Sequence, residues 1–327
     1  MKVAITEPMP LIEEELKILK DHAQVSVIGS TEHDAILKGT ADADVILVVY
    51  AKITREIIES ARNLRGIIKY GVGVDNIDVE TATRLGIIVA NVPDYAVETV
   101  ADHAMGLLLA LSRRIMVADR MMRSRSLGSW ASPPTTLKGV DLKGKCLGLL
   151  GVGRIGRAVS ERAKGFGMSV VAFDPYVPKE MGREMGVELM TFDQVLEKSD
   201  FISIHSPLTE ETRAMINEKS IAKMKDGVII INTARGPLID HAALVDALKS
   251  GKVGGAGLDV LQSEPPSPDD PIFSFDNVVL TPHIAYYTSE AIGRLEMSAV
   301  GHAIDILQGK MPKNTINGKQ VTKIRNA

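Results

Sequence analysis

The sequence predicts an α/β protein built from two doubly wound parallel-sheet domains. Three observations lead to this fold class. Short runs of β-branched residues alternate with segments of helical periodicity. A second strand–helix series starts near residue 145, so a complete domain precedes it. The chain has 327 residues, which is too long for one compact core.

The first hundred residues carry short apolar runs that we expect to be strands, separated by helical segments. This alternation favours a parallel sheet with helical crossovers. The expected strands are Val3–Thr6, Val25–Ile28, Asp44–Val49, Gly66–Tyr70 and Ile87–Asn91. The expected helices between them include Leu11–Lys20 and Asp78–Leu85.

One long helix is expected from about Val97 to Arg123. Its first turn is acidic and its end is basic, which matches the helix dipole. Apolar residues in its middle cover more than one face, so a single core cannot bury them all. A homodimer through residues 97–123 would cover the second face. Burial between the two domains of one subunit is the alternative.

The second strand–helix series runs from Lys145 to about His283, and a final helix follows it. Apolar residues recur at helical spacing from Ser289 to Leu307. We expect this helix to pack back onto the first domain. The tail after Gly309 is polar and is expected to be loosely held.

Composition argues against several classes of function. The formal net charge of −3 gives no electrostatic reason to expect a nucleic-acid or membrane partner. No apolar run approaches the ~20 residues of a membrane span, and the start of the chain lacks signal-peptide features. The one cysteine, Cys146, allows no intramolecular disulfide and is expected to be a small buried side chain. We therefore expect a soluble, cytoplasmic protein.

The segment Lys145–Gly156 is an apolar strand that runs into a Gly-x-Gly-x-x-Gly motif. The motif alone is weak, but a helical pattern follows it, so the glycines lie at a strand-to-helix turn. Gly151 would permit the tight turn, Gly153 would let a pyrophosphate approach, and Gly156 would let helix and strand pack closely. The helix N-terminus offers N–H groups to that pyrophosphate. The sequence therefore predicts a dinucleotide site.

Asp174 follows the next expected strand, Ser169–Phe173, about 20 residues beyond the glycines. A carboxylate at this place accepts hydrogen bonds from the adenosine ribose and repels a 2′-phosphate. The predicted cofactor is therefore NAD rather than NADP. The alternative is that Asp174 only caps the strand before Pro175.

Three ionisable residues follow neighbouring strands in the second half of the chain: Arg235, Glu264 and His283. Ligands of such sheets bind outside the carboxyl ends of the strands. Arginine can hold a substrate carboxylate in a bidentate fork, and histidine can give the proton that accompanies hydride addition to a keto acid. A neighbouring carboxylate can hold the ring and favour its charged form. These residues are the predicted catalytic set.

The other histidines are weaker candidates. Four lie in polar or helical segments and are expected at the surface: His22, His33, His241 and His302. His103 lies inside the long helix and is expected to be structural, while His205, close to Pro207, fits a turn that lines the cofactor. No HExxH or CxxC spacing occurs, so no metal site is predicted.

With these motifs the sequence resembles the D-isomer-specific 2-hydroxyacid dehydrogenases over nearly its whole length. The resemblance implies an NAD-binding Rossmann domain, residues 99–286, inserted into a flavodoxin-like substrate domain of residues 1–98 and 287–327. It implies hydride transfer between NAD(H) and a small D-2-hydroxy acid or 2-keto acid. The matching segments are Tyr70–Asp78, Gly148–Gly156, His205–Thr209, Asn232–Gly236, Asp259–Pro265 and Thr281–His283.

The resemblance also implies roles for single residues. Arg235 would bind substrate, Glu264 would polarise the histidine, and His283 would act as acid and base. Backbone N–H groups of Val72 and Gly73 would bind the substrate carboxylate. The expected cofactor-binding residues are Gly151, Gly153, Arg154, Ile155 and Gly156 at the pyrophosphate, Asp174 at the ribose, Thr233 and Asp259 at the nicotinamide half, and also His205, Pro207, Thr212, Ala234, His283 and Ala285.

Some segments of the chain resemble particular branches of this family. The chain is similar to phosphoglycerate dehydrogenases and hydroxypyruvate reductases, and Asn91–Tyr95 and His283–Thr288 look most like the C-terminal-binding corepressors. An NAD(H)-sensing dimeric scaffold is therefore the alternative function, although a scaffold would not need the whole catalytic set. An L-specific dehydrogenase would carry the glycine motif at its N-terminus. The substrate itself depends on loops near Tyr50–Lys52, Asp94–Tyr95 and Tyr286.

Overall fold

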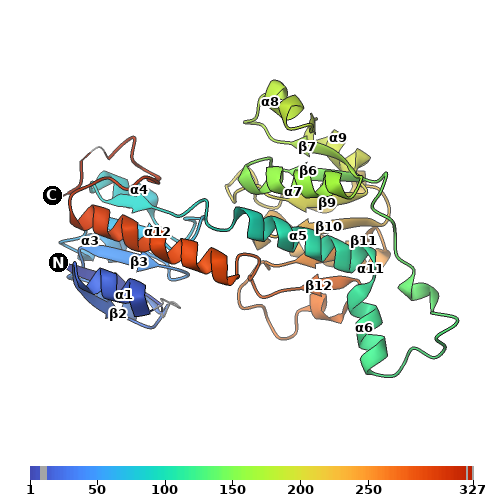
Figure 1. The fold of residues 1–327 in the computed structure, drawn as a ribbon, viewed down its shortest axis with the longest axis horizontal. Helices are drawn as coiled ribbons and strands as arrows, with labels where there is room; N and C mark the ends of the chain where they lie inside the picture. Colours follow the sequence, from blue (N-terminus) through green and yellow to red (C-terminus); the bar gives the residue numbers. More distant parts are fainter. Residues whose placement is uncertain (8–12, 322, 326–327) are drawn as a thin grey trace. The chain divides into compact units, whose positions relative to one another are not determined.

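The chain folds into two compact units in a computed structural model that describes residues 1–7, 13–321 and 323–325 (Figure 1). Unit 1 comprises Met1–Ala96 and Thr288–Ala327, and unit 2 comprises Val97–Tyr287. Unit 1 is thus formed by both ends of the chain, and unit 2 by one continuous stretch. Both units contain a wholly parallel sheet, which confirms the expected fold class.

The sheet of unit 1 has the strand order β2-β1-β3-β4-β5, which is the flavodoxin-like order. Each strand lies within one residue of its expected bounds, because β-branched apolar runs between polar turns mark these strands clearly. The strands are β1 (Lys2–Ile5), β2 (Gln24–Val27), β3 (Val45–Val48), β4 (Gly66–Lys69) and β5 (Ile88–Ala90).

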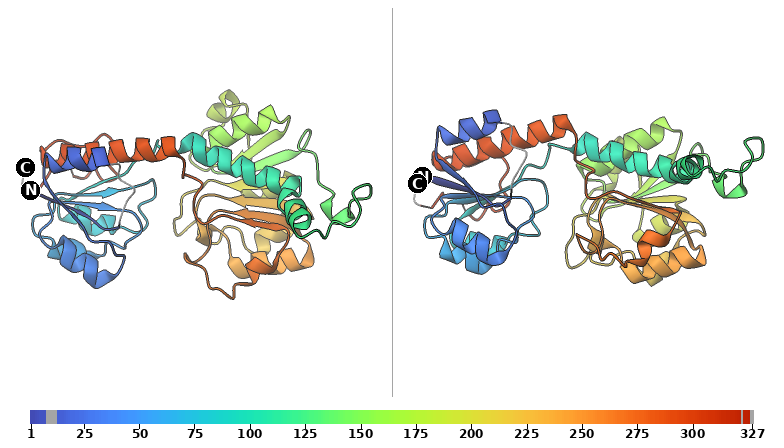
Figure 2. Two further views of the ribbon diagram at one scale, coloured as in Figure 1. Left: turned by 60° about the horizontal axis from the view of Figure 1, so that its bottom comes forward. Right: turned by 90° about the horizontal axis from the view of Figure 1, so that it is seen from below.

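Helices cover both faces of this sheet (Figure 2). One face carries α1 (Glu13–Lys20) and α12 (Ser289–Leu307), which contact each other. The other face carries α2 (His33–Thr40), α3 (Arg55–Ser60) and α4 (Val79–Arg84). The expected start of the first helix, Leu11, lies outside the described residues.

The last helix packs onto unit 1, as expected. A Cβ built on Gly66 of β4 would lie 2.4 Å from Ile306 Cδ1 of α12, so the helix lies directly on the strand. The described segment after α12 is also held, at Asn317, where a loose tail was expected. The Asn317 side chain accepts from Val89 N and donates to Ile87 O, both at 2.9 Å. One buried amide thereby ties the tail to β5.

The sheet of unit 2 has the strand order β12-β11-β10-β9-β6-β7-β8. The chain direction across the sheet reverses between β6 and β9, which is where doubly wound sheets bind ligands. The strands are β6 (Cys146–Leu150), β7 (Ser169–Phe173), β8 (Glu188–Leu189), β9 (Phe201–Ile204), β10 (Val228–Asn232), β11 (Val253–Leu258) and β12 (Val278–Leu280). Cys146 is buried in β6, as expected.

One face of this sheet packs against α5 and α7, and the other against α9, α10 and α11. Three short 3-10 helices lie at Thr135–Leu137, Gly236–Leu238 and Pro271–Ser274. The helices of unit 2 are α5 (Val97–Ser112), α6 (Ile115–Arg123), α7 (Arg154–Gly165), α8 (Lys179–Glu184), α9 (Phe192–Lys198), α10 (Glu218–Lys223) and α11 (His241–Ser250). In the described parts of the chain, every helix is too short or too polar to pass through a lipid bilayer.

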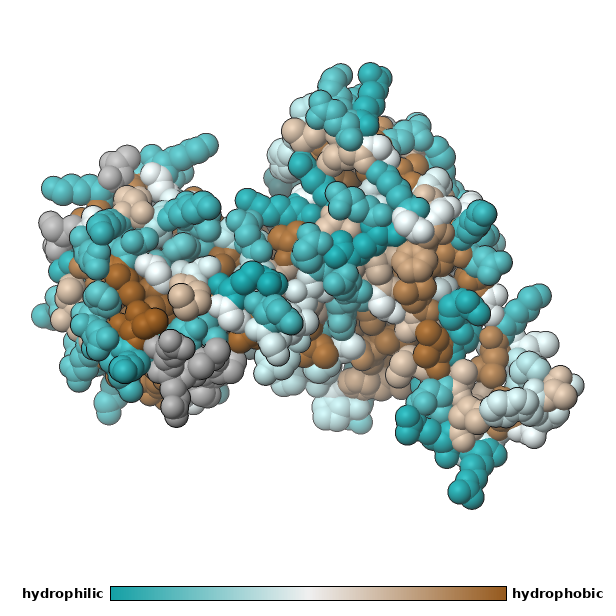
Figure 3. All heavy atoms as spheres, viewed as in Figure 1, coloured by the Kyte–Doolittle hydropathy of each residue, from teal (hydrophilic) through white to brown (hydrophobic). Residues whose placement is uncertain are grey.

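The expected single helix from Val97 to Arg123 is wrong, because it is divided into α5 and α6. Arg114, between the two helices, has a φ of 55°, a left-handed conformation that interrupts the α-helical hydrogen bonding. Helix α5 is largely buried, whereas α6 contains no buried residue. Three of its large apolar side chains are exposed instead: Ile115, Met116 and Met122. Apolar atoms reach the surface along α5 and beside α6 (Figure 3).

Candidate active site

The glycine loop joins β6 to α7 at the point where the strand order reverses. Gly151 has a φ of 98°, and a Cβ there would lie 2.9 Å from the backbone of His205. A Cβ on Gly156 would lie 2.3 Å from the carbonyl oxygen of Gly151. These contacts fit a tight turn at Gly151 and close packing of α7 at Gly156.

Gly153 is constrained differently from its neighbours. Apart from the adjoining residues, no described atom lies within 4 Å of the place where its Cβ would be. Gly153 is the N-cap of α7. Because glycine has no side chain, the N–H groups of the first turn receive no capping hydrogen bond from this position. The backbone N–H groups at the positive end of α7 therefore border open space, which suits the pyrophosphate of a dinucleotide.

Asp174 at the end of β7 faces the glycine loop. Its Oδ2 accepts from Val152 N and its Oδ1 accepts from Tyr176 N, both at 3.0 Å. The carboxylate therefore caps the turn after β7, as the alternative interpretation supposed. A carboxylate has about four acceptor sites, so the turn and a ribose contact are compatible.

His205 follows β9 beside the glycine loop. Its Nε2 lies 2.8 Å from Ser203 Oγ, and burial lowers the pKa of the ring to about 4. The ring is therefore neutral at physiological pH and unsuited to giving a proton. The Thr212 hydroxyl donates to the carbonyl of Pro207 at 2.7 Å and fixes the loop that follows. Cofactor binding by these residues stays a prediction.

The loop after β10 carries Arg235 and is organised by the fully buried Asn232. The Asn232 side chain accepts from Ala234 N at 3.0 Å and donates to Arg235 O at 2.9 Å. The neighbouring Thr233 is buried, and its hydroxyl has no hydrogen-bond partner among the described residues. A buried hydroxyl without a partner is unfavourable unless a ligand supplies one, which fits a contact with the nicotinamide half of NAD.

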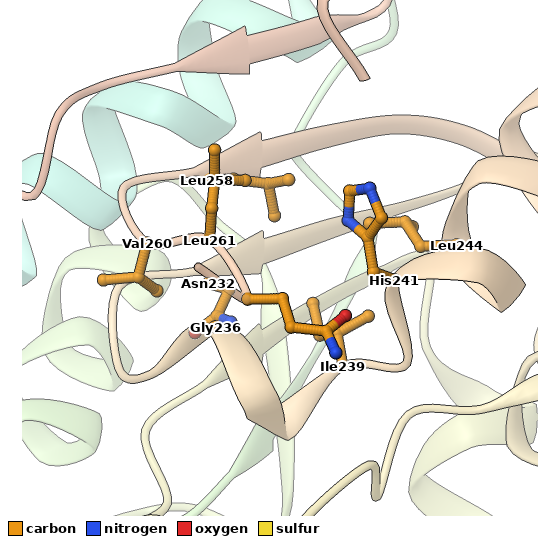
Figure 4. A pocket seen from close by; sticks show the side chains of 9 residues that line it. Asn232, Gly236, Ile239, His241, Leu244, Leu258, Val260 and Leu261 are labelled. Carbon is orange, nitrogen blue, oxygen red and sulfur yellow. The ribbon is translucent and has the colours of Figure 1, made fainter. Parts of the chain in front are cut away.

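The loop after β10 packs directly on the loop after β11. A Cβ on Gly236 would lie 1.9 Å from the carbonyl oxygen of Leu261, so only glycine fits this contact. A small pocket lies beside the junction, with His241 of α11 and Val260 among its lining residues (Figure 4). Arg235 does not line this pocket, so we assign the pocket to loop packing rather than to substrate binding.

Glu264 and His283 form a direct pair. Glu264 Oε2 lies 2.7 Å from His283 Nδ1, and Glu264 Oε1 accepts from Leu261 N at 3.2 Å. Burial would raise the pKa of Glu264, but the hydrogen bond and charge of His283, the Leu261 N–H and the charge of Arg235 together lower it. The carboxylate therefore stays ionised at neutral pH and holds His283 through Nδ1. The acid–base role of His283 stays a prediction.

Asp259 at the end of β11 is only 1% exposed, and its carboxylate is directed into the loop that carries His283. Its Oδ1 accepts from Thr281 Oγ1 at 2.5 Å and from Ile284 N at 2.9 Å. Its Oδ2 accepts from Ala285 N at 2.8 Å. The sequence predicted a nicotinamide contact here and missed this second role, because no local pattern pairs residue 259 with residues 281–285.

The two predicted substrate-binding N–H groups belong to unit 1. Val72 and Gly73 lie in the loop after β4, at the carboxyl edge of that sheet. Asn91 Nδ2 donates to Val72 O at 2.7 Å and fixes the loop. In unit 2 the structure brings together Glu264 and His283, with Arg235 close enough to lower the pKa of Glu264, and substrate binding by the unit 1 loop stays a prediction.

The remaining histidines differ in their surroundings. His22 and His33 are exposed, as expected, and His241 is half-buried with its Nε2 2.9 Å from Asp270 Oδ1. His302 was expected at the surface but is buried, with its ring beside the backbone of Asn91, just after β5. No group of His, Cys, Asp and Glu suited to a metal ion occurs in residues 1–7, 13–321 and 323–325.

Comparisons with known proteins agree with this geometry. Residues 105–285 match the family model for the NAD binding domain of D-isomer specific 2-hydroxyacid dehydrogenases. The chain is 43% identical to the D-3-phosphoglycerate dehydrogenase of Methanocaldococcus jannaschii, with 97% of this chain and 59% of that protein covered. It is 41% identical to the glyoxylate reductase of Korarchaeum cryptofilum, with 99% and 98% covered.

A solved structure with a similar fold is the D-lactate dehydrogenase from Aquifex aeolicus, complexed with NAD and lactic acid. The TM-score is 0.87 at 32% identity, and the match covers 97% of this chain and 99% of that one. The likeness to the glyoxylate reductase and the lactate dehydrogenase thus extends over nearly their whole lengths, whereas the chain spans 59% of the phosphoglycerate dehydrogenase.

Proposed function

The chain belongs to the D-isomer specific 2-hydroxyacid dehydrogenase family, and we propose that it interconverts a small D-2-hydroxy acid and its 2-keto acid with NAD(H). The observation that carries the proposal is the Glu264–His283 pair, 2.7 Å apart, with Arg235 close enough to act on Glu264. A hydrogen-bonded acid–base histidine beside a substrate-binding arginine is what reduction of a keto acid requires.

Each residue of the set has a separate task. NADH, when bound, supplies the hydride that reduces the carbonyl carbon. His283 gives a proton from Nε2 to the carbonyl oxygen, and takes it back from the hydroxyl in the oxidation. Glu264 stabilises the charged ring through Nδ1. Arg235 holds the substrate carboxylate by paired, charged hydrogen bonds, which a lysine could not reproduce.

We further propose NAD rather than NADP as the cofactor, on the strength of Asp174. Its carboxylate faces the glycine loop through Val152 N, where it would repel a 2′-phosphate. NADH should therefore be oxidised much faster than NADPH at equal concentration. Equal rates with both cofactors would remove this assignment.

We also propose a cytoplasmic homodimer that is formed through α5 and α6. The single cysteine fits a reducing compartment. Exposed Ile115, Met116 and Met122 on α6 form apolar surface that a second copy would cover. Replacing Met116 and Met122 by glutamine should shift the protein towards monomer in sedimentation experiments, while the same change at Met297, exposed on α12, should not.

The proposed function is tested by a substrate screen. Oxidation of NADH is followed with glyoxylate, hydroxypyruvate, pyruvate and larger 2-keto acids, and the product is analysed for its configuration. We expect the highest kcat/KM for one of the small acids, with the D-hydroxy acid as product where the carbon is chiral. Binding of NADH without turnover of any keto acid would instead favour the NAD(H)-sensing scaffold, which the comparisons do not favour.

A further inference from the structure

We propose that His103 of α5 is a positioning residue for His283 and acts on it through Thr281 and Asp259. The proposal rests on the proposed function to the extent that His283 is the group that transfers the proton. All four residues belong to unit 2. They come from α5, from the end of β11 and from the loop after β12.

The contact runs through two short hydrogen bonds. His103 Nε2 lies 2.9 Å from Thr281 Oγ1, and Thr281 Oγ1 lies 2.5 Å from Asp259 Oδ1. His103 Nε2 itself is 3.6 Å from the same carboxylate oxygen. Asp259 is buried, so its charge is stabilised by these groups rather than by water.

The direction of each hydrogen bond follows from the number of hydrogens. An ionised carboxylate only accepts, so the single hydroxyl hydrogen of Thr281 is donated to Asp259. The Thr281 oxygen must then accept from His103, which requires a hydrogen on Nε2 of that ring. Nε2 of His103 therefore carries a hydrogen.

The far end of this chain of contacts holds the backbone around His283. Asp259 accepts from Ile284 N and Ala285 N through its side chain, and from His283 N through its backbone carbonyl at 2.8 Å. His283 has a φ of 54°, a left-handed conformation that a histidine keeps only when its surroundings impose it. The oriented Asp259 carboxylate supplies that restraint, and with it the alignment of Nδ1 on Glu264.

The consequence concerns proton transfer rather than stability alone. Without the His103 donor, Thr281 is held by Asp259 alone, and the Asp259 carboxylate loses part of its alignment. The loop can then relax, and the bond between His283 and Glu264 becomes less well formed. A residue that only filled space on α5 would change the melting temperature but would leave the pH profile of the reaction where it was.

The test uses matched variants of the full chain. His103→Leu removes the donor, and His103→Gln retains an N–H group near the position of Nε2. His22→Leu, at an exposed position outside the site, is the control. We measure kcat and KM for keto-acid reduction against pH, and the affinity for NADH by fluorescence.

We expect His103→Leu to lower kcat about tenfold, the effect of one hydrogen bond in the chain, with NADH affinity little changed. The pH limb that reports His283 should move to lower pH, and His103→Gln should recover most of both losses. Thr281→Val interrupts the same chain, so the double variant should lose no more than the larger single loss. The proposal would be overturned if the loss of kcat in the double variant equalled the product of the two single losses. It would also be overturned if the pH limb did not move in His103→Leu.

A second measurement does not depend on turnover. Ring-nitrogen NMR of the parent protein should show His103 with its hydrogen on Nε2, and the His283 ring resonances should shift in His103→Leu but not in His22→Leu. A hydrogen on Nδ1 of His103, or unchanged His283 resonances, would contradict the proposal. Failure of the parent to reduce any keto acid would instead defeat the proposed function. The NMR result would be unaffected, because it does not depend on turnover.

Discussion

Two buried carboxylates, one in each unit, are accommodated in opposite ways. Asp259 of unit 2 accepts hydrogen bonds from Thr281, Ile284 and Ala285 and is 1% exposed. Glu296, on α12 of unit 1, is 0% exposed, and neither of its oxygens has a partner among the described residues. Burial is the same in both, so the number of donors decides whether each carboxylate can carry its charge.

The two solutions have different consequences. Burial, with the charge of Glu15, raises the pKa of Glu296 from 4.5 to about 7, so this group takes up a proton near neutral pH. Asp259 instead uses its oxygens to organise the loop of His283. A buried carboxylate with hydrogen-bond donors around it can orient a neighbouring loop. A buried carboxylate without such donors makes the stability of its unit depend on pH.

The largest effect should follow from replacing His283, which Glu264 contacts and whose loop Asp259 holds. We expect His283→Ala to lower kcat for reduction and for oxidation by about 10²–10⁴, the usual contribution of a positioned general acid. NADH affinity should be nearly unchanged. Steady-state kinetics in both directions, with fluorescence titration of NADH, check this, and substantial remaining activity would assign the proton to another group.

The next largest effect concerns Asp259, the buried carboxylate that accepts hydrogen bonds from its neighbours. In Asp259→Asn the new amide NH₂ must face one of the former donors, which leaves a buried N–H or hydroxyl without a partner. We expect a loss of about 1–3 kcal/mol in the free energy of unfolding of unit 2, together with lower kcat. Urea denaturation measures it. Asp102→Asn, at an exposed ion pair with Arg162, should change stability by less than about 0.5 kcal/mol.

The same type of substitution should have the opposite sign in unit 1. The raised pKa of Glu296 means that its favourable protonated form is fully present below pH 4.5 and is lost as pH rises through about 7. Glu296→Gln should therefore stabilise unit 1 at pH 8 by about 1–3 kcal/mol and have little effect at pH 4. Denaturation at both pH values, with exposed Glu290→Gln as the control, tests it. Equal effects at both pH values would mean that Glu296 is not protonated on folding.

The smallest effect should come from Glu264, whose charge modifies His283 without touching the reacting atoms. Glu264→Gln keeps a hydrogen-bonding group at Nδ1 but removes the charge. The pH limit of reduction should fall by about one unit, and oxidation should become favourable at correspondingly lower pH. Profiles of kcat/KM in both directions measure the shift. A profile that coincides with the parent's would leave Glu264 without an electrostatic role.

Much of the fold could be predicted because its signals are local. Strand β3 is a run of four β-branched or apolar residues, Val45–Val48, all buried, and such runs separated by helices specify a parallel sheet. The break between α5 and α6 could not be predicted in the same way. No glycine or proline marks Arg114, and its left-handed φ is imposed by the surroundings rather than by its own preference.

The site was predictable to the extent that its residues follow strands. Arg235, Glu264 and His283 were identified from their places after β10, β11 and β12. The contact of His103 with Thr281 joins residues 178 positions apart, and no periodicity or motif pairs positions at that distance. The burial of Glu296 was missed for a related reason, because α12 is covered by α1 as well as by the sheet.

Unit 1 is completed only by the last part of the chain, and this sets an order for biosynthesis. Strand β4 needs α12, and β5 needs Asn317, yet the roughly 190 residues of Val97–Tyr287 are translated between them. At about 5–20 residues per second, the nascent five-stranded sheet waits roughly 10–40 s before α12 covers its part of the face that α1 shares. Unit 2, being continuous, can fold on the ribosome in that interval. The apolar surface that α12 will cover is therefore exposed to aggregation during that interval.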